Sequence, residues 1–389
     1  MIMIAKNRLN AEDVRKMTEQ VMRETLSLEV RGYKCTSEMV CNVLMKAAVE
    51  GMSVESICAD LQGMTGSNTL REHLNTLLDV CALRQHECEM NAALVSCLPS
   101  ELPRRGREMA IDYHDEPFYG KTPELRSYAC RSAAKDGTTH FYRLASLYVM
   151  WRQVRVTLAL TYVLPEDDTA AVVQRLIERM QQLSFAPGVI YLDKGFCTGT
   201  VITFLQEHDL PAVIACPIRG DAGKGGTRSL CQGRKAYCTP YTFSDGTTVR
   251  LALYPSRVPD KTGRRRLKWL AYVLIHLDWS AKKAYRRYRR RFGIECSFRQ
   301  LRQVRVPTTS RNPALRFFLL GLALLLVNVW VRLRWFTSRI VDRGPARLDP
   351  DLFRLNRLIV FLRRAIENTF GVLDSIPIFS DRHDQIVIY

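Results

Sequence analysis

Three carboxylates occupy positions from which they could hold metal ions. Asp112 and Asp193 each end a short apolar run, in REMAID and GVIYLD, that we expect to form a buried strand. Glu295 is the only acidic residue between Tyr285 and Gln303, a segment with seven arginines. Neighbouring strands would bring the two aspartates to one edge of a sheet, and a helix packed on that sheet would add Glu295. The plainer alternative makes the aspartates turn residues and pairs Glu295 with an arginine along its own helix.

Converging carboxylates repel one another unless a cation lies between them. Carboxylate oxygens are the ligands that Mg²⁺ prefers, and Mn²⁺ accepts the same set. Two such ions about 3.5–4 Å apart recur in enzymes that cut or join phosphodiesters, where one activates water or a 3′-hydroxyl and the other stabilises the leaving oxygen. The residue types therefore favour a site for two Mg²⁺ ions that acts on nucleic acid.

The segment around Glu295 also predicts a charged helix face. Tyr288, Arg291, Glu295 and Arg302 are offset by 3, 7 and 14 residues, which places them within an arc of roughly 60° on a helix. Arginine forks match phosphate oxygens, and a tyrosine hydroxyl can add a hydrogen bond. We therefore expect Tyr288, Arg291 and Arg302 to contact DNA phosphates. An apolar stripe that could dock this helix lies beside them, at Ile294, Phe298 and Leu301.

The whole chain carries a large positive charge. The net charge is +18 and the pI is about 9.6, which favours a polyanionic partner, either nucleic acid or an anionic membrane. Other arginines of the charged helix, such as Arg289 and Arg299, would attract DNA phosphates in a general way. The apolar stretch 317–331 is shorter than the roughly twenty residues of a membrane span, so we expect a buried helix there.

Cysteine usage indicates a reducing compartment. Twelve cysteines are scattered along the chain without a C-x-x-C pair, and the N-terminus lacks the pattern of a signal peptide. We expect reduced thiols in a cytoplasmic protein. Neither the group at Cys81, His86 and Cys88 nor the pair Cys231 and Cys238 completes a zinc pattern.

The order of elements predicts an α/β protein with a mixed sheet and flanking helices. Helices are expected near 36–51, 53–62 and 69–83, compatible with a helix-turn-helix DNA reader or with a plain helical bundle. The stretch GDAGKGGT fails the phosphate-loop spacing, which argues against nucleotide binding. We divide the chain into a helical N-terminal domain, a first core part, a β-rich basic insertion, a second core part and a helical tail, at 1–105, 106–217, 218–268, 269–336 and 337–389.

These motifs together resemble a known family, the DDE transposases of bacterial insertion sequences that carry the Y-R-E signature. The pattern Tyr-x2-Arg-x3-Glu-x6-Lys/Arg fits Tyr288, Arg291, Glu295 and Arg302, with arginine where the family commonly has lysine. IDYHDEPFYG and YLDKGF are similar to the segments around the family's two aspartates, and RNPALRFFLLGLALLLVNVW to the helix after the signature. The resemblance spans about residues 110 to 335.

The resemblance implies a ribonuclease-H-like core that a β insertion interrupts between the second aspartate and the glutamate. It further implies Mg²⁺-dependent cleavage of DNA at element ends, with Asp112, Asp193 and Glu295 as metal ligands. Joining of the 3′ ends to target DNA would follow, by a homodimer or larger multimer acting on the bacterial nucleoid. The N-terminal helices would read the terminal inverted repeats.

Several points stay open at this level. In some relatives a tryptophan of the insertion stacks on a flipped base, and Trp269 and Trp279 lie in that region without a matching motif. We interpret His114 and Asp115 as supporting or loop residues rather than ligands. Two alternatives remain: a ribonuclease-H-like nuclease that does not join strands, and a domesticated DNA-binding protein without catalysis.

Overall fold

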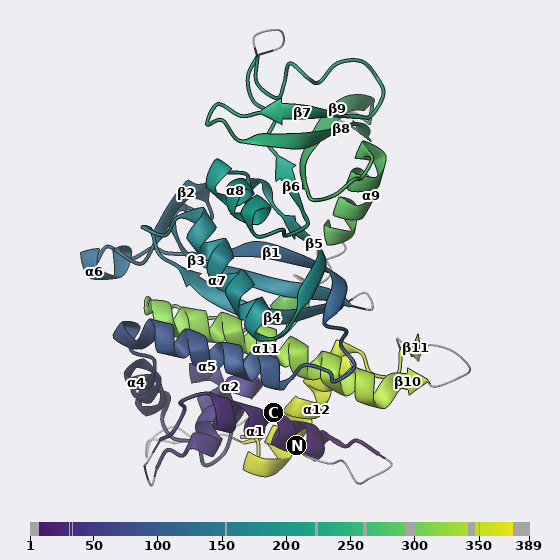
Figure 1. Cartoon of the computed structure of the whole chain (residues 1–389). Coiled ribbons are helices and arrows are strands. Elements are labelled where there is room, and N and C mark those ends of the chain that lie inside the picture. The colour runs from purple at the N-terminus through teal and green to yellow at the C-terminus, as the bar shows by residue number, and fades with distance from the viewer. Residues whose placement is uncertain are drawn as a thin grey trace.

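The computed structural model of the chain has a sheet region above a layer of helices (Figure 1). It describes residues 8–30, 32, 34–151, 154–221, 225–259, 263–292, 300–340, 347–349 and 351–375. The first and last described helices, α1 (Ala11–Thr25) and α12 (Leu355–Phe370), are neighbours in the helical layer. The layer that carries the aspartates is the sheet, and the helices below cover one of its edges.

The centre of the sheet has the strand order β4-β3-β1-β5-β6. β3 is antiparallel to β1 and to β4, whereas β5 and β6 run parallel to β1. This order and these directions are those of a ribonuclease-H-like core, so the predicted fold class is confirmed. The strands are β1 (Arg105–Pro117), β3 (Thr138–Trp151), β4 (Val154–Val163), β5 (Ala186–Leu192) and β6 (Ala212–Cys216).

Helices cover both faces of this core. α7 (Thr169–Gln182) connects β4 to β5 and α8 (Gly199–Glu207) connects β5 to β6, each beginning at a side-chain cap. α9 (Ala281–Phe292) packs on the opposite face, as the alternation along β1 shows: Ile111 joins the core that includes α7, while Ala110 joins a cluster that includes α9. A turn of helix, α6 (Pro123–Arg126), and β2 (Cys130–Lys135) precede β3.

The β-rich insertion continues the main sheet. β9 (Arg265–Ile275) pairs antiparallel with β6, and β8 (Thr248–Pro259) and β7 (Tyr237–Thr242) follow outward. The boundary expected at residue 268 therefore falls inside a strand. The inner half of β9, which pairs with β6, is buried, and its basic outer half is exposed. The change in composition along the sequence thus marks the change in burial within one strand.

The N-terminal helices and the C-terminal helix form one packed unit. α12 lies on α1 and α2, and the fully buried Lys46 of α2 makes ion pairs with Glu50 at 2.7 Å, Glu367 at 2.8 Å and Asp60 at 3.1 Å. The helix of the predicted tail segment, 337–389, therefore packs on the N-terminal helices. Its helices are α1 (Ala11–Thr25), α2 (Ser37–Glu50), α3 (Val54–Asp60), α4 (Ser67–Leu77), α5 (Leu83–Ser96) and α12 (Leu355–Phe370), with a 3₁₀ turn at Val80–Ala82.

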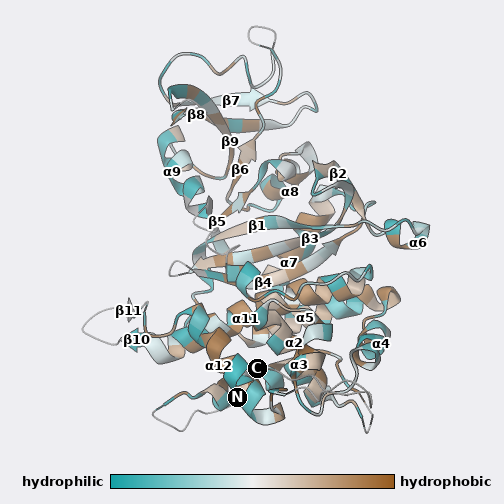
Figure 2. Cartoon of the chain, turned by 180° about the vertical axis from the view of Figure 1, so that it is seen from behind, coloured by the Kyte–Doolittle hydropathy of each residue, from teal (hydrophilic) through white to brown (hydrophobic). Residues whose placement is uncertain are grey.

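The apolar stretch forms a long helix that is buried in the protein. α11 (Pro313–Ser338) is long and apolar enough to cross a membrane, yet 94% of its most apolar eighteen-residue window is buried inside the chain. It packs on α5 and β4, and its hydrophobic character stands out from the hydrophilic α9 (Figure 2). The prediction of a core helix is confirmed. The short strands β10 (Arg339–Ile340) and β11 (Arg347–Leu348) follow it.

Side chains from α5 and α11 cover the outer edge of β4. The amide of Asn91 both accepts from the Leu160 backbone nitrogen (2.7 Å) and donates to the Leu160 carbonyl (2.9 Å). Asn328 does the same for Thr157, next to a bulge in the pairing of β3 and β4. An edge strand with unpaired peptide groups is a site for unwanted pairing, and these amides close it.

Candidate active site

The two aspartates lie side by side on adjacent parallel strands. Ile111 of β1 is in register with Leu192 of β5, which brings the next residues, Asp112 and Asp193, beside each other. Asp112 was expected to end its strand, but it is buried within β1, which continues to Pro117 because these residues pair with β3. Asp193 follows β5 directly, precedes the 3₁₀ turn Lys194–Phe196, and exposes 56% of its side chain. The strand register thus brings these two carboxylates together, as expected.

One arginine bridges the two carboxylates. Arg291 of α9 donates from Nη2 to Oδ1 of Asp112, and its Nη1 lies 3.5 Å from Oδ1 of Asp193. The Arg291 side chain is only 9% exposed, and the negative charge of Asp112 raises its pKa against the opposing effect of burial. The guanidinium therefore keeps its positive charge between the two negative ones.

Tyr288 anchors the helix that supplies this arginine. Its hydroxyl donates to the Leu192 carbonyl at 3.0 Å and accepts from Nη1 of Arg291 at 2.9 Å. The ring is buried, edge-on to Tyr191 of β5. Burial raises the pKa of Tyr288 well above its ordinary value, so the hydroxyl keeps its proton and remains a donor.

Two of the residues expected on this helix face, Tyr288 and Arg291, are turned inward in the DNA-free chain. Both side chains are buried and engaged within the protein, so a contact with DNA phosphates stays a prediction. The helical spacing grouped them correctly, yet that face packs on the sheet instead of facing solvent. Arg302 and Arg289 are exposed, and Arg289 donates to the Tyr285 hydroxyl at 3.2 Å.

Two residues of the expected site, Glu295 and Arg299, lie in 293–299, outside the described residues. The chain on either side of this segment is fixed to β1. Arg287 of α9 pairs with Glu108 at 2.9 Å, and beyond the segment Arg305 pairs with Glu116. Both ends of the stretch that contains Glu295 are therefore attached to the strand that carries Asp112.

A row of buried polar groups extends behind Asp112 on the face that α9 covers. The Tyr148 hydroxyl of β3 donates to Oδ2 of Asp112 at 3.0 Å. Burial raises the pKa of Tyr148, and the Asp112 charge adds to that effect, so the phenol stays a donor. Arg155 of β4 lies 4.0 Å from the centre of the Tyr148 ring and donates to Ser146 at 2.6 Å. Ser146 in turn is 2.8 Å from His114.

Sequence reasoning missed Tyr148 and Arg155. No motif contains them, and their relation to Asp112 depends on the antiparallel register in which Asp112 is opposite Ser146. One signal was present: Arg155 is a lone arginine in the otherwise apolar strand VRVTLALTYV. A buried arginine needs a partner of opposite charge, and Asp112 nearby provides negative charge.

His114 and Asp115 occupy different surroundings. His114 shares the face of Asp112, and burial holds the pKa of its imidazole well below 6.5, with the charges of Arg155 and Arg305 acting in the same direction. Asp115 points to the other face, where Arg143 of β3 holds it at 2.7 Å. Neither the Asp115 carboxylate nor the His114 imidazole therefore joins the pair of Asp112 and Asp193.

The donor set fits a divalent cation. Asp112 and Asp193 already share one cationic group, so the site accommodates positive charge, and both offer the oxygen ligands that Mg²⁺ prefers. Within the residues that the structure describes, no group of three or more potential metal ligands occurs. A third carboxylate from Glu295 would complete such a group.

The two tryptophans of the insertion region have distinct positions. Trp269 of β9 meets Tyr237 of β7 edge-on at 6.3 Å. Trp279 precedes α9, and the Lys283 ammonium lies 4.8 Å from the centre of its ring. A base-stacking role for either remains a prediction.

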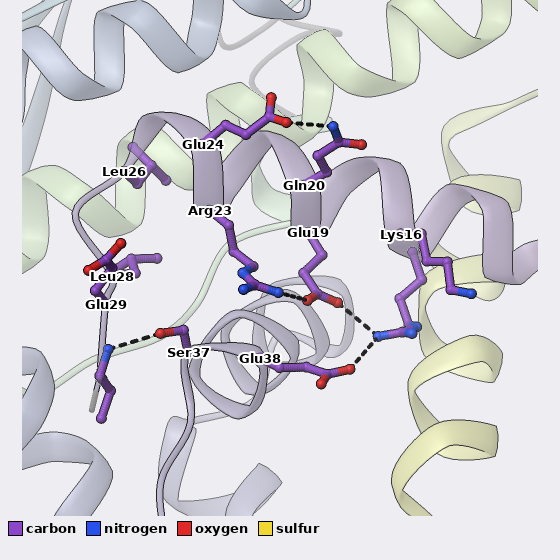
Figure 3. A pocket seen from close by; sticks show the side chains of 12 residues that line it. Lys16, Glu19, Gln20, Arg23, Glu24, Leu26, Leu28, Glu29, Ser37 and Glu38 are labelled. Atoms are coloured by element: carbon purple, nitrogen blue, oxygen red, sulfur yellow. Dashed lines mark hydrogen bonds and ion pairs between the residues drawn. The ribbon is translucent and has the colours of Figure 1, made fainter. Parts of the chain in front are cut away.

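A cavity lies away from this site, in the helical layer (Figure 3). Its volume is about 670 Å³, and it is bordered by α1, the following loop and α2. The charged groups around it pair with one another: Glu19 with Arg15 at 2.9 Å and with Arg23 at 3.5 Å, and Arg15 with Glu38 at 3.4 Å. This network joins α1 to α2.

Comparison with known proteins agrees with the strand order. Residues 158–329 match the family model of the transposase DDE domain, a span that contains Asp193 and Glu295 and begins after Asp112. No curated protein matches the sequence. Among solved structures, the chain is similar to a piggyBac transposase in a synaptic complex with hairpin DNA, determined by cryo-EM. The TM-score is 0.51 at 12% identity, over 98% of this chain and 86% of that one, which is a likeness of fold. The family match therefore identifies residues 158–329 as a transposase DDE domain, on a core with ribonuclease-H-like strand order.

Proposed function

We propose that this transposase cuts DNA at the ends of a bacterial insertion sequence and joins the 3′ ends to target DNA, with Asp112, Asp193 and Glu295 as ligands of two Mg²⁺ ions. One observation carries the proposal: Asp112 and Asp193 lie side by side on adjacent parallel strands and already share a cation, the Arg291 guanidinium. Such a pair, uncompensated, would be too repulsive to persist in a partly buried site.

Each residue of the proposed site has a separate task. Asp112 is oriented by the Tyr148 hydroxyl, and Asp193 presents its exposed carboxylate to solvent, from which DNA would approach. Bound Mg²⁺ would supply an activated water or 3′-hydroxyl and stabilise the leaving oxygen. Tyr288 holds α9 to the end of β5, which sets the starting point of the chain that leads to Glu295.

A basic surface beside the aspartates supports DNA as the partner. The outer face of α9 exposes Arg286 and Arg289. Tyr285 of α9 stacks on Tyr254 of β8 at 3.9 Å, which joins this helix to the ribbon of β8 and β9. Lys268 lies on the same face of that ribbon, so positive charge continues from α9 along the insertion. Phosphates bound along this surface would pass the exposed Asp193.

The outer ribbon has further features that suit a duplex. Val258 of β8 and Leu267 of β9 are 41% and 47% exposed, beside the exposed Arg257 and Arg265. A two-stranded ribbon fits the width of the major groove, and aliphatic side chains can pack against base edges there. We propose that this ribbon contacts DNA. The resemblance to the insertion-sequence family supports action as a homodimer or larger multimer on the bacterial nucleoid.

The test uses a plasmid that carries the gene with its native flanking DNA. We expect Asp112→Asn, Asp193→Asn and Glu295→Gln each to abolish Mg²⁺-dependent cleavage at the element ends. Asp115→Asn is the matched control, because its carboxylate lies on the same strand but pairs with Arg143 on the other face. Cleavage that survives in Asp112→Asn or Asp193→Asn would refute the metal assignment. Cleaved ends that are never joined to a target would favour the nuclease alternative.

A further inference from the structure

The guanidinium of Arg291 occupies the space between the carboxylates where the proposed function places metal ions. Its guanidinium contacts Oδ1 of Asp112 and lies 3.5 Å from Oδ1 of Asp193. These are oxygens that the proposed function assigns to metal ions. A divalent cation and a guanidinium cannot occupy the same space between them, and two cations so close would repel strongly.

We infer that Arg291 is a displaceable counter-ion, a positioning residue that holds the two aspartates together in the metal-free chain and leaves when metal binds. This inference rests on the proposed function, since it assumes that Asp112 and Asp193 are metal ligands. The phosphates of bound DNA are the natural acceptors for the released guanidinium, because DNA would pass the exposed Asp193 along α9. Arg291 thereby links metal loading to DNA binding.

The contacts of Arg291 are those of a group that can move. Its Nε is buried, yet has no hydrogen-bond partner among the described residues. Its separation from Asp193 is long for a charge-assisted hydrogen bond, which is typically near 2.8 Å. The solvent-exposed Asp193 leaves one side of the site open. A metal ion can therefore reach the carboxylates without first crossing a packed core.

The helix itself does not depend on this arginine. Tyr288 is bonded to the Leu192 carbonyl, and Arg287 pairs with Glu108 at 2.9 Å, so α9 has two other attachments to the sheet. Ala281 and Ala284 are buried against the same face. A rotamer change at Arg291 can thus occur while α9 stays docked.

The thermodynamic consequence is coupling between two ligands. Metal alone must displace the arginine from both carboxylates, whereas DNA that accepts the guanidinium removes this obstacle. By linkage, DNA then raises the affinity for metal, and metal raises the affinity for DNA by the same factor. The transposase would hold metal weakly in the absence of DNA, which restricts hydrolysis to assembled complexes.

The experiment measures Mn²⁺ binding to the DNA-free full-length chain by electron paramagnetic resonance. Arg291→Gln removes the competing charge, and we expect it to bind Mn²⁺ at least ~10-fold more tightly than the wild type. Arg291→Lys retains the charge and should stay within about 3-fold of the wild type. Arg289→Gln, an exposed position on the same helix, is the control and should leave the affinity unchanged.

A second readout uses the wild-type chain alone. Phenylglyoxal labels accessible arginines, and mass spectrometry locates the adducts. Buried Arg291 should resist labelling without metal and become reactive at saturating Mn²⁺, whether or not the Gln variant folds. Unchanged reactivity together with an unchanged Mn²⁺ affinity of a folded Arg291→Gln would refute the counter-ion role.

The same titration separates this inference from the proposed function. Asp112→Asn should weaken Mn²⁺ binding strongly if that carboxylate is a ligand. Unaltered binding in Asp112→Asn would overturn the metal assignment and the counter-ion role with it. Weakened binding in Asp112→Asn, with no effect of Arg291→Gln and no change in labelling, would overturn the counter-ion role alone.

Discussion

Replacing Asn328 by leucine tests how the helical layer holds the core of this transposase. Asn328 is the fully buried amide within the apolar α11. Its Oδ1 accepts from the Thr157 backbone nitrogen at 3.0 Å, and its Nδ2 donates to the carbonyls of Thr157 at 2.8 Å and Leu94 at 3.1 Å. The side chain thus pairs with Thr157 as a neighbouring strand would, beside the bulge of β4.

The expected cost follows from these three bonds. Leucine has a similar volume but no polar atoms, so each bond is lost, at about 1 kcal/mol apiece, and the Thr157 nitrogen is left without this acceptor in a dry site. We therefore expect the free energy of unfolding to fall by about 3–5 kcal/mol. For 389 residues unfolding together, the unfolding entropy is about 0.8 kcal/mol/K, so Tm should fall by about 4–6 °C.

Urea unfolding followed by circular dichroism, with a thermal scan, measures both quantities. The control is Leu325→Met on the same helix, also fully buried, where a volume-conserving exchange should cost less than about 1.5 kcal/mol. A loss below about 1 kcal/mol in Asn328→Leu would show that Thr157 finds other partners. In that case the amide would not be what closes the edge of β4.

Three further predictions concern other contacts. Lys46→Met should lower the free energy of unfolding by about 1–3 kcal/mol; the loss is limited because water can solvate the partly exposed carboxylates of Asp60 and Glu367. Hydrogen exchange should then become faster in α12 before it does so in other helices. Tyr148→Phe removes a donor from Asp112 and should raise the Mg²⁺ concentration needed for half-maximal cleavage ~10-fold, measured on the native element ends. A hydrogen bond from the Cys216 thiol lowers the pKa of Cys197, so more thiolate is present near neutral pH. Mass spectrometry should find that Cys216→Ala slows alkylation of Cys197 by iodoacetamide.

The sequence predicted the core because strong local signals agreed with the fold. The short apolar runs before Asp112 and Asp193 are both in strands, β1 and β5, and only β1 continues past its aspartate. Local signals could not predict the register between β1 and β3, since nothing local specifies that Asp112 is opposite Ser146. Tyr148, two positions further along β3, therefore could not be connected with Asp112 before the strand pairing was known.

The sequence also could not predict burial that depends on residues far apart in the chain. The tail was expected to be helical and α12 is, but its partner depends on contacts between residues more than three hundred positions apart, such as Lys46 and Glu367. A lysine is rarely buried, and composition predicts it at the surface. Lys46 is nevertheless buried because Glu50, Asp60 and Glu367 pair with it. No sequence motif marks these three carboxylates as its partners.

The signature helix shows that a helical pattern groups residues without predicting what covers them. Helical spacing established that Tyr288 and Arg291 share a face, but spacing has no information about what covers that face. The cluster of Ala281, Ala284 and Tyr288 against the sheet settles it. Once that face is buried, the arginine meets the strand ends instead of solvent, and its charge becomes part of the carboxylate site. A phosphate contact by Arg291 then requires that something else neutralise Asp112 and Asp193, and bound metal ions would do so.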